Sequence, residues 1–148
     1  MKNFPFKEIC FICTANECRS PMAEKIFAHI LKQNGVKGLK VSSAGLNATG
    51  QIEMTLKAKR ALKTLGINAG AKKSKQLTKL NPTTLYITME QMHKNAINKE
   101  NVLTFASIVG GEDIFDPYGQ SQESYNKTAA QINYYCLRLF EKIKKSEK

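Results

Sequence analysis

The segment from Cys13 to Pro21 concentrates side chains that can do chemistry. It reads Cys-Thr-Ala-Asn-Glu-Cys-Arg-Ser-Pro and directly follows the apolar run of residues 9–12. A cysteine thiolate is a strong nucleophile, and an arginine guanidinium presents a planar fork that matches two oxygens of a phosphoryl group. Cys13 and Arg19 are therefore candidates for a nucleophile and an anion-binding group within one loop.

This loop is expected to join a strand to a helix. Residues 7–13 form a short apolar run of the buried-strand type, and residues 21–33 place apolar side chains at helical spacing. Backbone N–H groups in such a loop point inward and the helix start carries partial positive charge, so the loop favours anions and the thiolate form of Cys13. We expect Ser20 as the N-cap and Pro21 as the first helical residue. The alternative interpretation is a buried strand-end cysteine near an unrelated arginine.

The rest of the chain alternates strands with helices. Further strands are expected at residues 39–43, 83–89 and 101–105, and further helices at 52–65, 90–97 and from 121 or 122 to about 145. This alternation predicts an α/β fold, a parallel sheet flanked by helices on both faces. Ligands of such sheets bind at the carboxyl ends of the strands, which is where the Cys13 loop falls.

Length and cysteine usage exclude several classes of protein. A chain of 148 residues predicts a single domain spanning residues 1–148. No apolar stretch approaches the roughly 20 residues of a membrane helix and the first residues lack a signal-peptide core, so we expect a cytoplasmic protein without a membrane partner. Cys10 and Cys13 have the spacing of half a zinc site, but no second ligand pair follows, so no metal is expected.

The charge balance favours acidic partners. The chain carries 23 basic and 12 acidic residues, a net charge of +11, and no acidic residue lies between Met54 and Met89. The basic residues of that stretch are Lys57, Lys59, Arg60, Lys63, Lys72, Lys73, Lys75 and Lys79. Because no aromatic platform is interleaved with them, nucleic acid is not expected, and a solvated basic face or a rim for a phosphorylated substrate is favoured.

The segment Cys13–Glu24 resembles the phosphate-binding loop of the low-molecular-weight protein-tyrosine phosphatase family. Further blocks are similar to family blocks and follow in the family's order: Ser43-Ala44-Gly45, Gly66-Ile67, Gln76-Leu77-Thr78, Ile87-Thr88-Met89 and Asp116-Pro117-Tyr118-Gly119. The resemblance covers nearly the whole chain. It implies a four-stranded parallel sheet flanked by helices, with the phosphate-binding loop after the first strand.

The resemblance also implies a role for each site residue. Cys13 would attack phosphorus and form a phosphocysteine, Arg19 would hold the phosphoryl oxygens, and Asp116 would protonate the leaving group and then activate water. Substrate-binding positions would be Thr14, Ala15, Asn16, Glu17, Cys18, Ser20 and Tyr118. Ser20 would also stabilise the thiolate, and Asn16 would shape the loop by bonding to Ser43. The implied partner is a phosphorylated protein, the product is inorganic phosphate, and no cofactor or metal is required.

Three positions depart from the family pattern. Ala15 stands where the family usually has glycine, so a backbone φ above zero there would carry strain. Lys72 stands where many relatives have a histidine that supports the Asn16 network. Glu17 stands where many tyrosine phosphatases carry an apolar residue and phosphoarginine phosphatases carry threonine. Its carboxylate could repel a phosphate dianion and pair with a guanidinium, or it could point to solvent.

These observations favour phosphotyrosine hydrolysis over three other functions. Phosphotyrosine hydrolysis is the principal expectation, and phosphoarginine hydrolysis is the alternative because of Glu17 and of the resemblance of residues 89–131 to bacterial relatives with that activity. Arsenate reduction would need a further cysteine pair, and none lies between Cys18 and Cys136. A phosphate-binding module without turnover is the fourth. In the enzymatic interpretations Cys18 either packs beside the loop or forms a reversible disulfide with Cys13.

Overall fold

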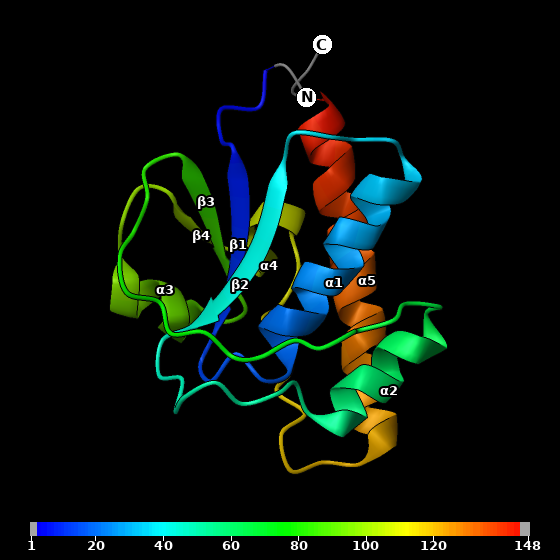
Figure 1. Ribbon diagram of the computed structural model, residues 1–148. Helices are drawn as coiled ribbons and strands as arrows, with labels where there is room; N and C mark the ends of the chain where they lie inside the picture. The colour runs from blue at the N-terminus through cyan, green and yellow to red at the C-terminus, as the bar shows by residue number, and fades with distance from the viewer. Residues whose placement is uncertain (1–2, 146–148) are drawn as a thin grey trace.

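The computed structural model describes residues 3–145 (Figure 1). The strands are β1 (Glu8–Cys13), β2 (Lys40–Gly45), β3 (Thr84–Thr88) and β4 (Val102–Thr104). The helices are α1 (Arg19–Gln33), α2 (Leu56–Thr64), α3 (Gln91–Ile97), α4 (Phe105–Val109) and α5 (Gln122–Lys145). The predicted α/β fold is confirmed.

All four strands are parallel and lie in the order β2-β1-β3-β4. The chain therefore winds outward from β1 in both directions, and β1 is the point at which the strand order reverses. Such a switch point opens a crevice at the carboxyl ends of the strands. In the register of β1 and β2, Cys13 pairs with Gly45, so the last residues of the two strands meet at that edge, at the lower end of the sheet in Figure 1.

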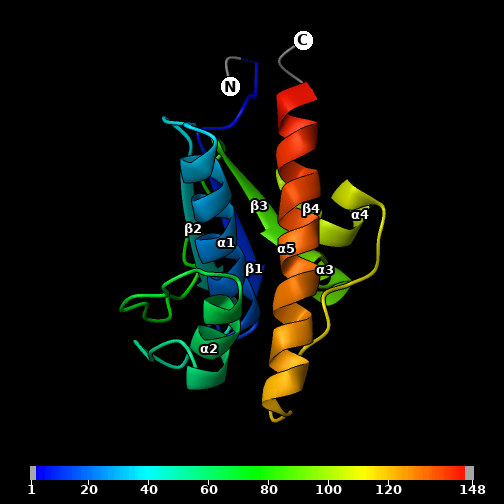
Figure 2. The ribbon, with the colours of Figure 1, turned by 90° about the vertical axis from the view of Figure 1, so that its right-hand side faces the viewer.

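The alternation of side chains along β1 divides the core into two clusters. Ile9, Phe11 and Cys13 face the larger cluster, which α1 and α5 cover from one side. Figure 2 shows these two helices in front of the sheet. Cys10 and Ile12 face a smaller cluster on the other side, covered by the end of α3 and by leucines of the segment 65–83. Burial on both faces explains why β1 is almost continuously apolar in sequence.

The start of α1 differs from the prediction. The helix begins at Arg19, with Cys18 at the N-cap and without a side-chain cap hydrogen bond, so the expectation of a Ser20 N-cap and a Pro21 helix start was wrong. The physical reason is that the Ser20 hydroxyl is engaged by two other side chains, Cys13 and Asn16. Pro21 lies in the first turn, where a missing N–H removes no intrahelical bond.

One other boundary was wrong, and one short helix was missed. The helix expected at 52–65 begins only at Leu56, because the N–H groups of Ile52 and Met54 bond to the segment 72–74 and Thr55 caps the helix by accepting from the Ala58 N–H. The short helix α4 was not predicted. It starts where Thr104 ends β4 and accepts a hydrogen bond from the backbone of the first turn.

Within residues 3–145, no helix has both the length and the apolar character needed to span a bilayer.

Candidate active site

Cys13 ends β1 with its side chain buried at the base of the following loop. Its Sγ atom lies 2.9 Å from Ser20 Oγ, and only 3% of the residue is exposed. The loop is pressed against the end of β2, because a Cβ atom on Gly45 would stand 2.7 Å from the Thr14 carbonyl oxygen. Glycine at the end of β2 thus allows the loop to close over the strand ends.

Asn16 fixes the conformation of the loop. It is buried and adopts the left-handed backbone conformation, with φ of 59°. Its Nδ2 donates to Ser20 Oγ (2.8 Å) and Ser43 Oγ (2.9 Å), and its Oδ1 accepts from the Lys75 N–H (2.9 Å). The residue with positive φ in this loop is therefore Asn16, and Ala15 carries no strain of this kind.

The donors around Ser20 have a defined direction. Because Asn16 donates into the Ser20 oxygen, the Ser20 hydrogen is available to the Cys13 sulfur. The serine hydroxyl is thus oriented as a neutral donor at the candidate nucleophile.

A second set of contacts supports Asn16 from outside the loop. Ser43 accepts from Asn16 and donates to Glu24 Oε1 at 2.6 Å, and Lys72 Nζ lies 3.3 Å from the same carboxylate oxygen. Lys72 and Glu24 are both largely buried. The lysine thus supports the Asn16 network through Glu24 and Ser43, at the position where the resemblance implies a histidine.

Arg19 is anchored on one side of its guanidinium. Nη1 donates to Glu90 Oε1 at 2.6 Å and to the Ile114 carbonyl at 2.9 Å, and 3% of the side chain is exposed. Two bonds use both hydrogens of Nη1. The Nε and Nη2 edge is the one that can form the planar, bidentate contact with a phosphoryl group.

Asp116 belongs to the segment between α4 and α5, far from Cys13 in sequence. Its Oδ2 atom lies 3.6 Å from Arg19 Nη2, while its Oδ1 accepts from the Tyr118 N–H at 3.1 Å. The segment is tied down nearby, because the Ile114 N–H bonds to the Met89 carbonyl at the end of β3. Half of the Asp116 side chain is exposed, so the carboxyl group faces the solvent-accessible side of the loop.

His93 of α3 holds the first residue of the loop after Cys13. Its Nδ1 accepts from the Glu90 N–H at 3.2 Å, so the neutral ring carries its proton on Nε2 and donates to Thr14 Oγ1 at 3.0 Å. Burial, and then the nearby Arg19 charge, lower the pKa of His93, which keeps the ring neutral. Thr14 itself is exposed at the mouth of the site.

The remaining cysteines lie in different surroundings. Burial raises the pKa of Cys18, whose thiol contacts Tyr125 and Thr55, so this cysteine stays protonated. Cys10 faces the opposite side of the sheet from Cys13, and burial raises its pKa to about 11. Because Cys10 and Cys13 face opposite sides of β1, they cannot both be ligands of one zinc ion. All four cysteines are free thiols, so a Cys13–Cys18 disulfide stays a prediction.

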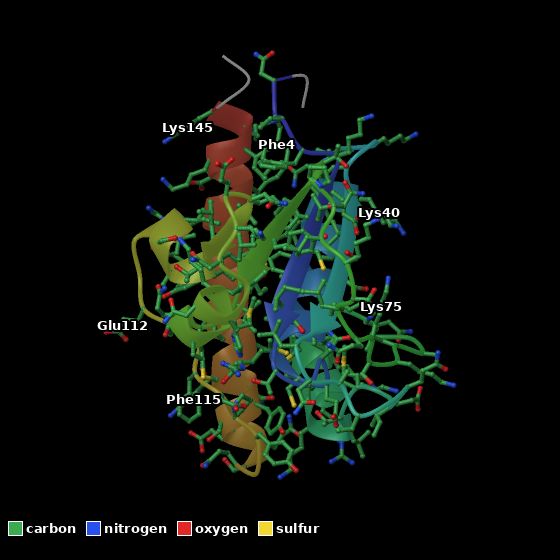
Figure 3. The ribbon with its side chains drawn as sticks, turned by 90° about the vertical axis from the view of Figure 1, so that its left-hand side faces the viewer. Phe4, Lys40, Lys75, Glu112, Phe115 and Lys145 are labelled. Carbon is green, nitrogen blue, oxygen red and sulfur yellow. The ribbon has the colours of Figure 1, made fainter. Side chains whose placement is uncertain are left out.

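The structure brings most of the expected site residues together. Residues 13–20, Ser43 and Asp116 converge at the carboxyl ends of β1 and β2, and Tyr118 is 73% exposed beside Asp116. Figure 3 shows the neighbouring Phe115 at the opposite end of the molecule from Phe4 and Lys145. Glu17 is half-buried, and its carbonyl accepts from the Thr55 N–H. Among residues 3–145 no group of three or more histidine, cysteine or acidic side chains could hold a metal ion.

Three site residues were not predicted: Glu24, Glu90 and His93. The last two follow β3 directly, at the edge of the sheet where ligands bind, and Glu-x-x-His at a helix start is a capping-box pattern. That pattern could have been found in the sequence. Glu24 ends the segment that resembles the family's loop, but its role could not be predicted because its partners come from positions 43 and 72.

A doubly wound parallel sheet with a cysteine-centred phosphate loop defines the class of protein. The chain matches the family model "Low molecular weight phosphotyrosine protein phosphatase" over residues 8–148. A protein-arginine-phosphatase of Geobacillus stearothermophilus is 36% identical over 145 residues, covering 91% of this chain and 95% of the relative. The low-molecular-weight protein-tyrosine-phosphatase Ptp of Acinetobacter johnsonii is 32% identical over 136 residues, covering 86% and 91%.

Solved structures agree with this match. The crystal structure of a low-molecular-weight protein tyrosine phosphatase from T. tengcongensis superposes with a TM-score of 0.85 at 32% identity, covering 91% of this chain and 98% of that chain. The chain therefore belongs to the low-molecular-weight phosphotyrosine protein phosphatase family, and the predicted resemblance is confirmed. It is an enzyme of a cysteine-dependent phosphatase family whose named members act as protein-tyrosine or protein-arginine phosphatases.

Proposed function

We propose that this protein removes phosphoryl groups from protein side chains through a phosphocysteine on Cys13. The observation that carries the proposal is the convergence of three groups. The Cys13 sulfur lies beneath the loop with a hydroxyl donor at 2.9 Å, the anchored Arg19 closes the same loop, and Asp116 lies 3.6 Å from that guanidinium.

In the first step, Cys13 Sγ attacks phosphorus while the bond from phosphorus to the leaving atom breaks. The loop amides and Arg19 hold the equatorial oxygens, where charge is spread in the transition state. Protonated Asp116 gives its proton to the leaving oxygen or nitrogen. In the second step the Asp116 carboxylate takes a proton from water, the water oxygen attacks phosphorus, and the S–P bond breaks to release inorganic phosphate and the thiolate.

Phosphotyrosine is the first candidate substrate. Tyr118 is largely exposed two residues after the proposed acid, and an aromatic side chain at the rim can stack against the ring of a substrate tyrosine. A relative of similar length, 32% identical, is named a protein-tyrosine-phosphatase.

Phosphoarginine is the second candidate, and two specific observations favour it. Glu17 lies in the loop itself, where its carboxylate could pair with the guanidinium of a substrate arginine. A relative that is 36% identical is named a protein-arginine-phosphatase. In this case the bond that breaks is P–N, and Asp116 protonates the guanidino nitrogen.

Steady-state kinetics with an aryl phosphate, a phosphotyrosine protein and a phosphoarginine protein test the proposal. Cys13→Ser is expected to abolish turnover of every substrate, whereas Cys10→Ser, the same change on the other face of β1, is expected to retain it. Asp116→Ala is expected to slow turnover most for poor leaving groups. Turnover that survives Cys13→Ser would refute the phosphocysteine route.

The ratio of kcat/KM values on the two phosphoproteins decides between the candidate substrates. If Glu17 recognises a guanidinium, Glu17→Ile is expected to lower phosphoarginine hydrolysis and to raise phosphotyrosine hydrolysis. A preference for phosphotyrosine that is unchanged by Glu17→Ile would count against the second candidate.

A further inference from the structure

A groove of about 720 Å³ runs between α2 and residues 66–70. Leu56, Lys59, Arg60 and Lys63 line its helical side. These positions are spaced by three, four and seven residues along α2, so they form one continuous face of the helix. The groove therefore combines one apolar side chain, Leu56, which is 60% exposed, with three cationic side chains.

The groove is electropositive and its charges are available. No acidic residue lies between Met54 and Met89, and both Arg60 and Lys63 are exposed. Lys59 is 3.6 Å from Glu53, a carboxylate that is itself half exposed. An exposed pair of this kind is weak, so Lys59 remains able to attract an anionic ligand.

The first turn of α2, which carries the groove residue Leu56, contacts the candidate active site. The Thr55 N–H, at the N-cap of α2, donates to the Glu17 carbonyl of the phosphate loop at 3.1 Å. On the other side, Lys57 Nζ donates to the Gln120 carbonyl at 2.7 Å and Gln122 Nε2 donates to the Lys57 carbonyl at 2.9 Å. The first turn of α2 is thus tied to both loops of the site, and the helix runs away from them (Figure 1).

We propose that this groove binds an acidic segment of the protein substrate, a few residues away from the phosphorylated side chain. The proposal rests on the phosphatase function proposed above. The nine residues of α2 span about 13 Å, the length of roughly four residues of extended peptide. Aspartate or glutamate side chains in that stretch would face Lys59, Arg60 and Lys63, and an apolar residue nearest the phosphoryl group would contact Leu56.

Two phosphopeptides with the same phosphorylated residue test this interaction. One carries four glutamates on one side of it, and the other carries four glutamines. We expect kcat/KM to be about threefold to thirtyfold higher for the glutamate peptide, mainly through KM, because each exposed ion pair contributes modestly. The difference is expected to shrink at high salt, which screens exposed charges. Equal values for the two peptides at low salt would overturn the proposal.

Charge reversal locates the contact. In an Arg60→Glu/Lys63→Glu variant the preference for the glutamate peptide is expected to disappear or to reverse. The matched control is Lys99→Glu/Lys142→Glu, which changes the net charge equally outside the groove, because Lys99 precedes the start of β4 and Lys142 lies in the last turn of α5, and it is expected to retain the preference. If the control variant loses as much of the preference for the glutamate peptide as the groove variant does, the effect is one of net charge and the proposal is wrong.

Binding of an unphosphorylated, fluorescently labelled glutamate peptide separates the two proposals. Fluorescence anisotropy with the wild-type protein and with Arg60→Glu/Lys63→Glu reports on the groove without any turnover. If no phosphorylated compound is hydrolysed but the peptide still binds in an Arg60- and Lys63-dependent way, the phosphatase proposal fails and the groove stands. If a single-stranded oligonucleotide competes for the groove more strongly than the peptide, the groove is a nucleic-acid site and the proposal fails.

Discussion

Glu90 holds Arg19 from the side opposite to the candidate phosphate site. The two side chains meet at 2.6 Å between Oε1 and Nη1, and Glu90 lies at the N-cap of α3, just after β3. The Ile114 carbonyl occupies the second hydrogen of Nη1. The flexible Arg19 side chain is thereby fixed before any ligand is bound. Phosphate binding therefore does not carry the entropy cost of ordering the guanidinium.

We therefore expect Glu90→Ala to lower kcat/KM by about 10-fold to 100-fold. The loss corresponds to one charge-assisted hydrogen bond of roughly 1.5–3 kcal/mol. Glu90→Gln keeps an acceptor without the charge, so its kcat/KM is expected to lie between the values for Glu90→Ala and the wild type. The measurement is steady-state kinetics on an aryl phosphate together with inhibition by inorganic phosphate. Unchanged inhibition in Glu90→Ala would contradict an anchoring role.

The pairing of Lys72 with Glu24 predicts a pattern of coupling. Lys72→Met leaves the largely buried Glu24 carboxylate with the more distant Lys25, 4.0 Å from Oε2, as its remaining cation, and we expect a loss of unfolding free energy of about 1–3 kcal/mol with a lower kcat. Glu24→Gln keeps a hydrogen-bond acceptor for Ser43. In the double variant the penalties are expected to be less than additive. Strict additivity in denaturant unfolding and in kcat would show that the two residues act independently.

The contact between Gly45 and the phosphate loop predicts that a single methyl group disturbs the site. In Gly45→Ala the new Cβ would lie 2.7 Å from the Thr14 carbonyl, and a backbone atom cannot swing away. We expect at least a tenfold loss of kcat/KM, with a folded far-UV circular dichroism spectrum. Gly35→Ala is the control, because φ of 66° strains alanine there but no atom lies within 4 Å. It is expected to lose about 1 kcal/mol of stability and to keep its activity.

The buried His93 predicts a pH dependence of stability. Its pKa is lowered in the folded protein from the ordinary value of 6.5, so below that pH the unfolded chain binds the proton more readily than the folded chain. The stabilisation that the neutral ring provides is therefore complete above about pH 6.5 and is lost as the pH falls towards the lowered value. Urea unfolding between about pH 5 and about pH 8 measures this slope.

The control for the histidine is His93→Gln. Glutamine can still donate to Thr14 and accept from the Glu90 N–H, but it does not titrate over this range. We expect the slope between about pH 5 and about pH 7 to be smaller in this variant than in the wild type. A slope of the same size in both proteins would assign the pH dependence to other groups.

Local sequence signals predicted the fold and the phosphate loop because the relevant contacts are close in the chain. The apolar run before Cys13 and the helical spacing after Pro21 are both visible in the sequence, and the structure confirms the strand–loop–helix unit and the parallel sheet. The helix start at Arg19 was mispredicted because the partner of the Ser20 hydroxyl is Cys13, seven residues earlier. The preference of serine for the N-cap position does not indicate whether its hydroxyl is already used in a tertiary hydrogen bond.

The supports of the site were harder to predict because their partners are distant in the chain. Glu24 accepts a hydrogen bond from Ser43 and forms an ion pair with Lys72. Thr14 is hydrogen-bonded to His93, which lies 79 positions later in the chain. Each of these residues, considered alone, is an ordinary polar residue on a helix, in a strand or in a loop. Their proximity follows only from the parallel order of the strands, which brings four carboxyl ends to one edge.

Position 16 has to satisfy two independent requirements at once. A left-handed backbone admits glycine, asparagine and aspartate at low cost, whereas three polar partners at the end of the side chain require both a two-hydrogen donor and an acceptor. Glycine meets only the first requirement, glutamine only the second, and aspartate lacks the hydrogens. A saturation library at this codon is thus expected to return a single working amino acid, even though the side chain is bonded to Ser20, Ser43 and the Lys75 backbone and not to Cys13.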